Sequence, residues 1–322
     1  HNGIEYGDIQ LICEAYAVLS QIGGLSAPEL AGIFAQWNAG ELDSYLIEIA
    51  SKVLAHTDPD TGRPLVDLIL DRAGQKGTGK WTSQEALNLG VPIPTIDAAL
   101  WSRNISAAKA QRVEASTRIA GVRSGAVLAG AERSKLIDAV GQALYASKVA
   151  SYAQGLAMLR AASEEHGYDL DLIELARIWK GGCIIRAELL DTIQAAFRRQ
   201  RDLPNLLLDS GFAGALNDLN AAWRHTAHVA RQLGVPCPAT SASLDYFDSY
   251  RAAQLPANLI QGQRDFFGAH TYHRTDRPGT FHTEWEAPVQ PGRPDEAGSV
   301  PSAPQGTVGE DEPAERVDKT PG

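Results

Sequence analysis

The chain has 322 residues, of which 44% are hydrophobic and 21% are charged. This composition predicts a folded protein with a sizeable core and excludes a chain that is disordered over most of its length. The formal net charge of -10 argues against a nucleic-acid-binding protein, which needs a basic surface to displace counterions. No run of about 18 uncharged apolar residues is present, so we expect no transmembrane helix and no membrane partner.

Apolar residues at helical spacing dominate the first part of the chain. They predict helices over residues 8–22 and 41–54, and the capping box Ser26-Ala-Pro-Glu29 predicts the start of another helix between them. Few runs alternate as strands do, and β-branched residues are sparse. We therefore predict an all-α fold.

Two pairs of similar segments recur at almost the same distance along the chain. Glu29-Leu-Ala-Gly-Ile-Phe34 resembles Glu174-Leu-Ala-Arg-Ile-Trp179 at an offset of 145, and Gly90-Val-Pro-Ile-Pro94 resembles Gly234-Val-Pro-Cys-Pro238 at an offset of 144. This period is much longer than the ~20–50 residues of solenoid repeats. It predicts a large helical domain over residues 1–250 with an internal duplication of a multi-helix unit, whose halves span about 1–130 and 145–250.

The last part of the chain has a different composition. From about residue 288 onward Pro, Gly, Ser, Ala and Glu dominate, and large hydrophobic residues are almost absent. Such a segment cannot bury enough surface to offset the entropy lost on ordering. We therefore predict a disordered tail over residues 286–322.

Two groups of residues near the beginning could carry chemistry. On a helix, His1 and Glu5 share one face, and Asn2 and Tyr6 form a second such pair beside them. Gly74-Gln-Lys-Gly-Thr-Gly-Lys-Trp-Thr82 combines glycines with cationic and hydroxyl side chains, as anion-binding loops do, but lacks the Walker A spacing. Taken singly, the first pattern is more typical of an exposed helix turn, and the second is equally typical of a basic surface loop.

Two further groups add positive charge. Arg103 follows an apolar helical pattern, and arginine is well suited to bidentate phosphate binding. Arg264 and His270 flank an aromatic pair and a turn of small residues. Without context, an ordinary surface charge and an ordinary helix end explain these two groups better.

Four longer segments, in this order along the chain, together resemble the 6-phosphogluconate dehydrogenase family. They are His1-Asn-Gly-Ile-Glu-Tyr-Gly-Asp-Ile-Gln-Leu-Ile-Cys-Glu-Ala-Tyr16, the Gly74–Thr82 segment, Ile178-Trp-Lys-Gly-Gly-Cys-Ile-Ile-Arg186 and Leu255-Pro-Ala-Asn-Leu-Ile-Gln-Gly-Gln-Arg-Asp-Phe-Phe-Gly-Ala-His-Thr-Tyr272. The resemblance runs from His1 to about Trp285 and leaves only the tail uncovered.

This resemblance implies the architecture and the reaction of the family. The family has an N-terminal Rossmann domain for NADP, a large duplicated helical domain and a C-terminal arm, expected here over residues 251–285, that enters the partner subunit. The implied reaction of the pentose phosphate pathway is the oxidative decarboxylation of 6-phosphogluconate to ribulose 5-phosphate and CO2. It reduces NADP, needs no metal and takes place in the cytoplasm.

The resemblance also assigns roles to residues near the start of the chain. Glu5 matches the general acid that protonates C1 of the enediol, and His1 and Asn2 match residues that orient the substrate. The residues that match the phosphate-binding groups are Tyr6, Lys76, Thr78 and Arg103. Charge-assisted donors suit a phosphate dianion, and the acid role requires a pocket that raises the pKa of Glu5 toward neutrality.

Arg264 and His270 match the residues that the arm contributes to the site of the neighbouring subunit. A homodimer is therefore expected, because these two side chains are useful only in the site of a second copy.

The chain departs from the family pattern at its beginning. The lysine base of the family lies three residues before the histidine of the first motif, a position that would precede His1, and no Gly-x-Gly-x-x-Gly follows a strand. We therefore expect the 322-residue chain to be inactive alone. One alternative is a non-catalytic helical protein that dimerises or binds phosphosugars. A weaker one is another hydroxyacid dehydrogenase of related architecture.

Overall fold

Helices make up most of the residues that the computed structural model describes, which are 1–122 and 128–286. The prediction of an all-α fold is confirmed. The chain divides into two units, residues 1–251 and the residues from 252 onward. The predicted tail lies outside the described residues except for residue 286.

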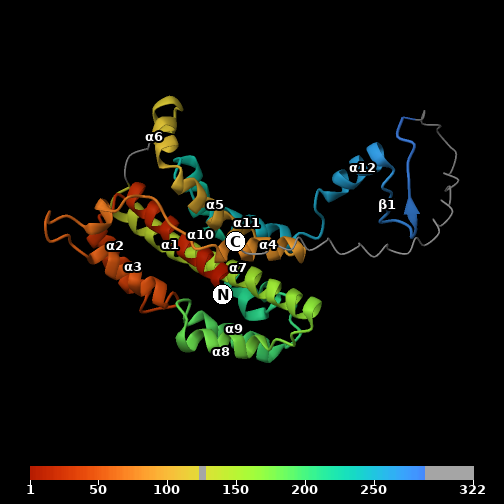
Figure 1. Ribbon diagram of the computed structural model, residues 1–322, viewed down its shortest axis with the longest axis horizontal. Coiled ribbons are helices and arrows are strands. Elements are labelled where there is room, and N and C mark those ends of the chain that lie inside the picture. The colour runs from red at the N-terminus through yellow and green to blue at the C-terminus, as the bar shows by residue number, and fades with distance from the viewer. Residues whose placement is uncertain (123–127, 287–322) are drawn as a thin grey trace, which may run out of the picture. The chain divides into compact units, whose positions relative to one another are not determined.

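The first unit contains the duplicated region and the candidate residues of the chain up to Arg103. Figure 1 shows the arrangement of its helices. Its elements are α1 (Asn2–Gln21), α2 (Ala27–Trp37), α3 (Tyr45–Ala55), η1 (Leu65–Leu68), α4 (Thr78–Asn88), α5 (Pro94–Ala107), α6 (Lys109–Arg118), α7 (Gly130–His166), α8 (Leu172–Gly182), α9 (Leu189–Arg199), η2 (Leu206–Leu208), α10 (Ser210–Gln232) and α11 (Pro238–Arg251).

The predicted helices are present, but two of their starts differ from the prediction, since α1 begins at Asn2 and not at residue 8. The helix predicted over 8–22 is confirmed as part of α1, and the predicted capping box at Ser26 and Glu29 is present at the start of α2. The start predicted at residue 41 is wrong, because α3 begins at Tyr45. Ser44 caps this helix, since its side chain accepts a hydrogen bond from the Ile47 backbone N–H, and such a cap sets the first turn.

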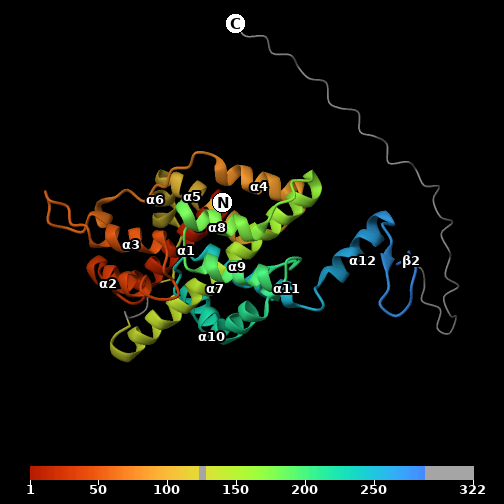
Figure 2. The same cartoon turned by 90° about the horizontal axis from the view of Figure 1, so that it is seen from below.

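The 37-residue helix α7 runs through the middle of the first unit, and α1 lies against it in both views (Figures 1 and 2). Glycines bring these two helices close together. A Cβ on Gly155 of α7 would collide with Ile4, and a Cβ on Gly7 of α1 would collide with Ser151. Gly7 and Gly155 therefore allow α1 and α7 an approach that larger residues would block.

The repeated segments adopt the same local structure at equivalent places. The first pair lies in α2 and α8, and the second pair directly precedes α5 and α11. Gly90 and Gly234 have φ of +66° and +70°, in the left-handed region that favours glycine. The duplicated fold is thus visible in the backbone, while the boundaries of the two halves stay a prediction.

Each half caps a helix of the other half. Glu14 of α1 accepts hydrogen bonds of 2.8 Å from the backbone N–H groups of Ala239 and Thr240 at the start of α11. Gln154 of α7 accepts one of 3.0 Å from the backbone N–H of Thr95 at the start of α5. A long helix of each half therefore satisfies otherwise unpaired N–H groups at the start of a helix of the other half.

The second unit comprises α12 (Ala257–Gly268) and the two-stranded antiparallel sheet of β1 (Tyr272–His273) and β2 (Thr280–Phe281). The carboxylate of Asp265 in this unit is fully buried. Four groups approach this carboxylate at 2.9–3.1 Å, namely Thr271 N–H, His282 Nδ1, Thr283 N–H and Trp285 Nε1. The carboxylate thus ties the end of α12 to both strands' flanking segments.

These contacts predict a pH dependence of the second unit. Burial alone would raise the pKa of Asp265, but its hydrogen bonds from His282 and the other donors lower that pKa to about 2. The same bond raises the pKa of His282. The stabilisation from Asp265 is therefore present above about pH 4 and is lost as the pH falls through about 2, whereas that from His282 is present below about pH 6.5 and is lost as the pH rises through its raised pKa.

We expect the fluorescence of Trp285, read against a Trp285→Phe control, to report a loosening of this unit as the pH rises above about 6.5. The His282→Asn variant should lack this transition. A transition of unchanged size in that variant would contradict the assignment to His282.

Candidate active site

The first turn of α1 carries three of the candidate side chains, with His1 directly before it. Asn2 Nδ2 donates to Glu5 Oε2 at 3.4 Å, so the amide and the carboxyl group face each other. The ring of His1 lies edge-on to Trp179 of α8, with 6.0 Å between the ring centroids. His1 Nε2 is buried and has no hydrogen-bond partner among the described residues. A buried, unpaired ring nitrogen is a group that a polar ligand could satisfy.

Glu5 has the electrostatics of a proton donor. Burial raises the pKa of its carboxyl group, and the positive charge of Arg103 opposes this effect in part. The protonated form is therefore favoured to a higher pH than in water, as general acid catalysis near neutrality requires.

Tyr6 is held between two other elements. The guanidinium of Arg103, on α5, stacks over the ring of Tyr6 with 3.7 Å to its centroid. Gly79, in the first turn of α4, faces the same ring, and a Cβ there would lie 2.5 Å from it. Only a glycine allows α4 to approach α1 so closely. The Tyr6 ring is therefore held between Gly79 on one element and the Arg103 guanidinium on another.

The remaining phosphate candidates lie where the chain enters α4. Lys76 is exposed on the loop before this helix, and Thr78 is the first helical residue, next to Gly79. Gly77 between them has φ of +99°, a conformation that favours glycine. Arg103 Nη1 reaches the same loop and donates to the Gly74 carbonyl at 3.4 Å. The structure thus brings Tyr6 and Arg103 together beside the start of α4, where Thr78 is the first residue, with Lys76 on the adjoining loop.

Arg264 and His270 belong to the second unit, which is described by itself. Arg264 Nη1 donates to Gln261 Oε1 at 3.0 Å on the exposed face of α12, and the His270 ring is edge-on to Phe267 at 5.8 Å. Their contribution to a neighbouring subunit stays a prediction.

Two residues of the site were missed by reasoning from the sequence. Trp179 packs against His1, and Gly79 contacts Tyr6. Both lie inside the segments that carry the family resemblance, so the motifs contained the signal, but nothing in the residue pattern assigned a contact to either residue.

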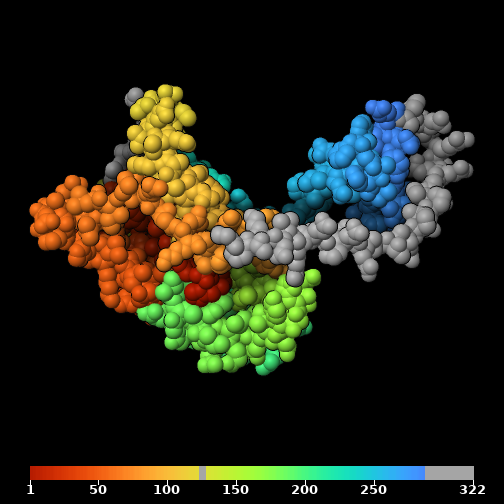
Figure 3. Space-filling model, in the orientation of Figure 1, coloured from red at the N-terminus to blue at the C-terminus, as the bar shows by residue number. Residues whose placement is uncertain are grey.

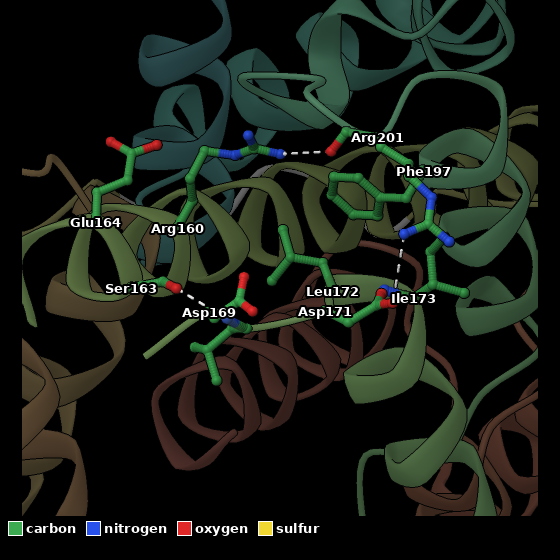
Figure 4. Close-up of a pocket in the computed structure, with 10 residues that line it drawn as sticks. Arg160, Ser163, Glu164, Asp169, Asp171, Leu172, Ile173, Phe197 and Arg201 are labelled. Carbon is green, nitrogen blue, oxygen red and sulfur yellow. Dashed lines mark hydrogen bonds and ion pairs between the residues drawn. The ribbon is translucent and has the colours of Figure 1, made fainter. Parts of the chain in front are cut away.

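A separate cavity of about 340 Å³ lies at the junction of α7, α8 and α9 (Figure 4). Its polar groups largely satisfy one another. Arg160 donates to the Arg201 carbonyl at 3.2 Å, Arg201 lies 3.7 Å from a carboxylate oxygen of Asp171, and Ser163 Oγ accepts from the Leu170 N–H at 2.9 Å. None of its lining residues was a candidate, and the arrangement leaves the first turn of α1 as the better candidate site.

Within residues 1–122 and 128–286, no three His, Cys, Asp or Glu side chains are grouped so that they could hold a metal ion. No helix in this part of the chain combines the length and the apolar character that crossing a membrane requires.

Comparison with known proteins identifies the family. The family described as "6-phosphogluconate dehydrogenase, C-terminal domain" matches residues 1–285. The NADP(+)-dependent, decarboxylating 6-phosphogluconate dehydrogenase of Bacillus subtilis is 56% identical over 285 residues, which cover 88% of this chain and 60% of that protein. The decarboxylating enzyme of Synechococcus elongatus is 54% identical over 287 residues, with 88% and 60% covered.

A solved structure supports the same conclusion. The Plasmodium falciparum 6-phosphogluconate dehydrogenase, determined in its apo form and in complexes with NADP+ and with 6-phosphogluconate, is 45% identical, with a TM-score of 0.84 over 88% of this chain and 61% of that chain. The chain spans about three fifths of the length of these relatives. The chain therefore belongs to the 6-phosphogluconate dehydrogenase family, and residues 1–285 match its C-terminal domain.

Proposed function

We propose that this chain binds 6-phosphogluconate and supplies the substrate-binding and proton-donating groups of its oxidative decarboxylation to ribulose 5-phosphate and CO2. The observation that carries the proposal is the packing of Arg103 on Tyr6, the residue directly after Glu5, beside the loop of Lys76. Cationic and hydroxyl donors thus lie next to a carboxyl group whose pKa is raised.

The phosphate of the substrate would bind between α5 and the start of α4. Arg103 and Lys76 supply positive charge, and the hydroxyl groups of Tyr6 and Thr78 supply neutral donors. The first N–H groups of α4 have no partner within the helix and favour an anion at this end. An acidic protein can bind a dianion in this way, because its positive charges are concentrated locally.

The sugar-acid end of the substrate would lie along the first turn of α1. Glu5, in its protonated form, donates a proton to C1 of the enediol that remains after CO2 leaves. His1 and Asn2 hydrogen-bond the substrate and fix C1 relative to this proton. The hydrogen bond from Asn2 to Glu5 supports this arrangement, because it orients the carboxyl group.

NADP is the proposed hydride acceptor, as in the name of the Bacillus subtilis relative. The sheet within the described residues is a single two-stranded antiparallel one, and no glycine-rich turn joins a parallel strand to a helix there. These residues by themselves do not fit a dinucleotide. The hydride transfer is therefore assigned to no residue of this chain.

Calorimetric titration of the purified chain with 6-phosphogluconate tests the proposal. We expect saturable binding of 6-phosphogluconate and much weaker binding of gluconate, which lacks the phosphate. Equal affinity for both compounds would contradict the phosphate site, and no binding of either would contradict the proposed function as a whole.

A homodimer in which Arg264 and His270 enter the partner's site is part of the same proposal. Exposed apolar side chains in both units support this part of the proposal. Helix α6 has no buried residue and projects from the first unit, with Ile119 72% exposed directly after it (Figures 1 and 3). On α12, Phe267 is 71% exposed. Several large apolar side chains exposed on one helix are typical of an interface, and α12 exposes Leu259, Ile260, Phe266 and Phe267.

Sedimentation velocity at micromolar concentration should therefore show a dimer. A monomer under these conditions would count against the contribution of Arg264 and His270 to a second site.

We also propose a cytoplasmic location, because a phosphorylated sugar acid does not cross membranes without a transporter.

A further inference from the structure

The loop that brings Lys76 to the proposed phosphate site has almost no packing of its own. Residues 71–76 are all exposed, and they connect the segment after η1 to α4 without regular structure. Ordering such a segment costs conformational entropy that burial does not offset here. The position of Lys76 must therefore depend on polar contacts.

Those contacts lead to one place, the end of α5 and the start of α6. Ser106 Oγ accepts a hydrogen bond of 3.0 Å from the Ala73 N–H, and Asn104 Oδ1 accepts one of 2.7 Å from Gln75 Nε2. The hydroxyl group of Ser106 also donates to the Arg103 carbonyl at 2.7 Å. The loop is thus fastened to the residues that immediately follow Arg103.

Arg112 of α6 fastens the beginning of the loop. Its Nη1 lies 2.9 Å from Asp71 Oδ2, and its Nη2 donates to the carbonyls of Asp71 at 2.9 Å and Ser106 at 3.1 Å. Hydrogen bonds from Lys109 and Arg112 lower the pKa of Asp71 to about 2, so the carboxylate stays charged at neutral pH. A planar guanidinium with several fixed donors is well suited to such a clamp.

We propose that Ser106, Asn104 and Arg112 are positioning residues that hold Lys76 where it and Arg103 contact the same phosphate. One helix end then sets both cations, because Arg103 belongs to it directly and Lys76 is tied to it through the loop. This inference rests on the proposed function and deepens it. It adds residues that touch no substrate but determine the geometry of the two cations that do.

A double-mutant cycle on the full chain tests this role. Ser106→Ala and Asn104→Ala each remove one anchor, and we expect each to weaken 6-phosphogluconate binding by about 2- to 10-fold, the range of one lost hydrogen bond. In a Lys76→Ala background the same substitutions should change the affinity less than about 2-fold, because the group that they position is gone. Ser116→Ala is the matched control, since its hydroxyl group bonds only locally to the Val113 carbonyl on the exposed face of α6.

A purely structural role would lower the affinity equally in both backgrounds, and that result would overturn the proposal. Unchanged affinity in Ser106→Ala and Asn104→Ala, with a loss in Lys76→Ala, would overturn the positioning role and leave the proposed function intact. If the unmodified chain binds no 6-phosphogluconate, the positioning role and the proposed function are both wrong. Because Asn104 is exposed, its variant should fold, and unfolding curves of all variants verify this.

Discussion

Replacing Arg103 with alanine should weaken the binding of 6-phosphogluconate by about 30- to 300-fold, which corresponds to about 2–3.4 kcal/mol. The substitution removes a charge-assisted donor from the phosphate and the cation that stacks on Tyr6. It also removes the contact with the Gly74 carbonyl, which steadies the loop of Lys76. Isothermal titration calorimetry on the full chain measures the effect.

Two further variants make this result specific. Arg103→Lys keeps the charge but loses the planar group, so we expect an intermediate affinity. Arg118→Ala removes an exposed arginine of α6 that pairs with Glu114 on the same helix, and it should leave the affinity unchanged. An Arg103→Ala variant that binds as tightly as the parent would exclude the proposed phosphate site.

Replacing Lys148 with methionine should lower the free energy of unfolding by about 3–5 kcal/mol. Lys148 Nζ lies 2.9 Å from Asp8 Oδ1, and the two side chains are only 2% and 1% exposed. Both carboxylate oxygens of Asp8 lack any other partner among the described residues. Without the lysine, the buried carboxyl group between α1 and α7 would have no ion-pair partner, and burying an unpaired polar group costs free energy. Urea denaturation followed by circular dichroism measures the loss.

The matched control is Lys135→Met on the same helix, where the ion pair with Glu132 is exposed and the expected change is within about 0.5 kcal/mol. The double variant Lys148→Met/Asp8→Leu should be more stable than Lys148→Met, because no charge is left buried. If the single and double variants were equally unstable, the cost would come from packing and not from the unpaired carboxylate.

Local signals in the sequence predicted much of the helical fold. The capping box at Ser26 and Glu29 and the apolar spacing from residue 8 onward correspond to α2 and α1. The start of α3 was missed, because apolar spacing continues through Leu42 while the cap at Ser44 decides where the helix begins. The spacing of apolar residues indicates which face of a helix is buried, but it does not indicate which polar residue caps the start of that helix.

The candidate site was predictable only through the family resemblance. Outside the site, the buried ion pair of Lys148 was not predictable either, since a lysine in the middle of α7 has no pattern that separates it from a surface charge. The side chains of Asn104 and Ser106, at the end of α5, accept hydrogen bonds from the Gln75 side chain and the Ala73 N–H, which lie about 30 positions earlier on a loop without periodicity. Contacts of this kind arise from tertiary packing and leave no local trace in the sequence.

The exchange of caps between the two halves has a consequence for synthesis in the cell. Glu14 and its partners at the start of α11 are 225 residues apart. At about 5–20 residues per second, translation separates their appearance by about 10–45 s. During this time Glu14 has left the ribosome without the N–H groups of α11 that it bonds, so its buried carboxyl group lacks these partners. Completion of the first unit is therefore set by the last helix to be made, and we expect its folding to be largely post-translational.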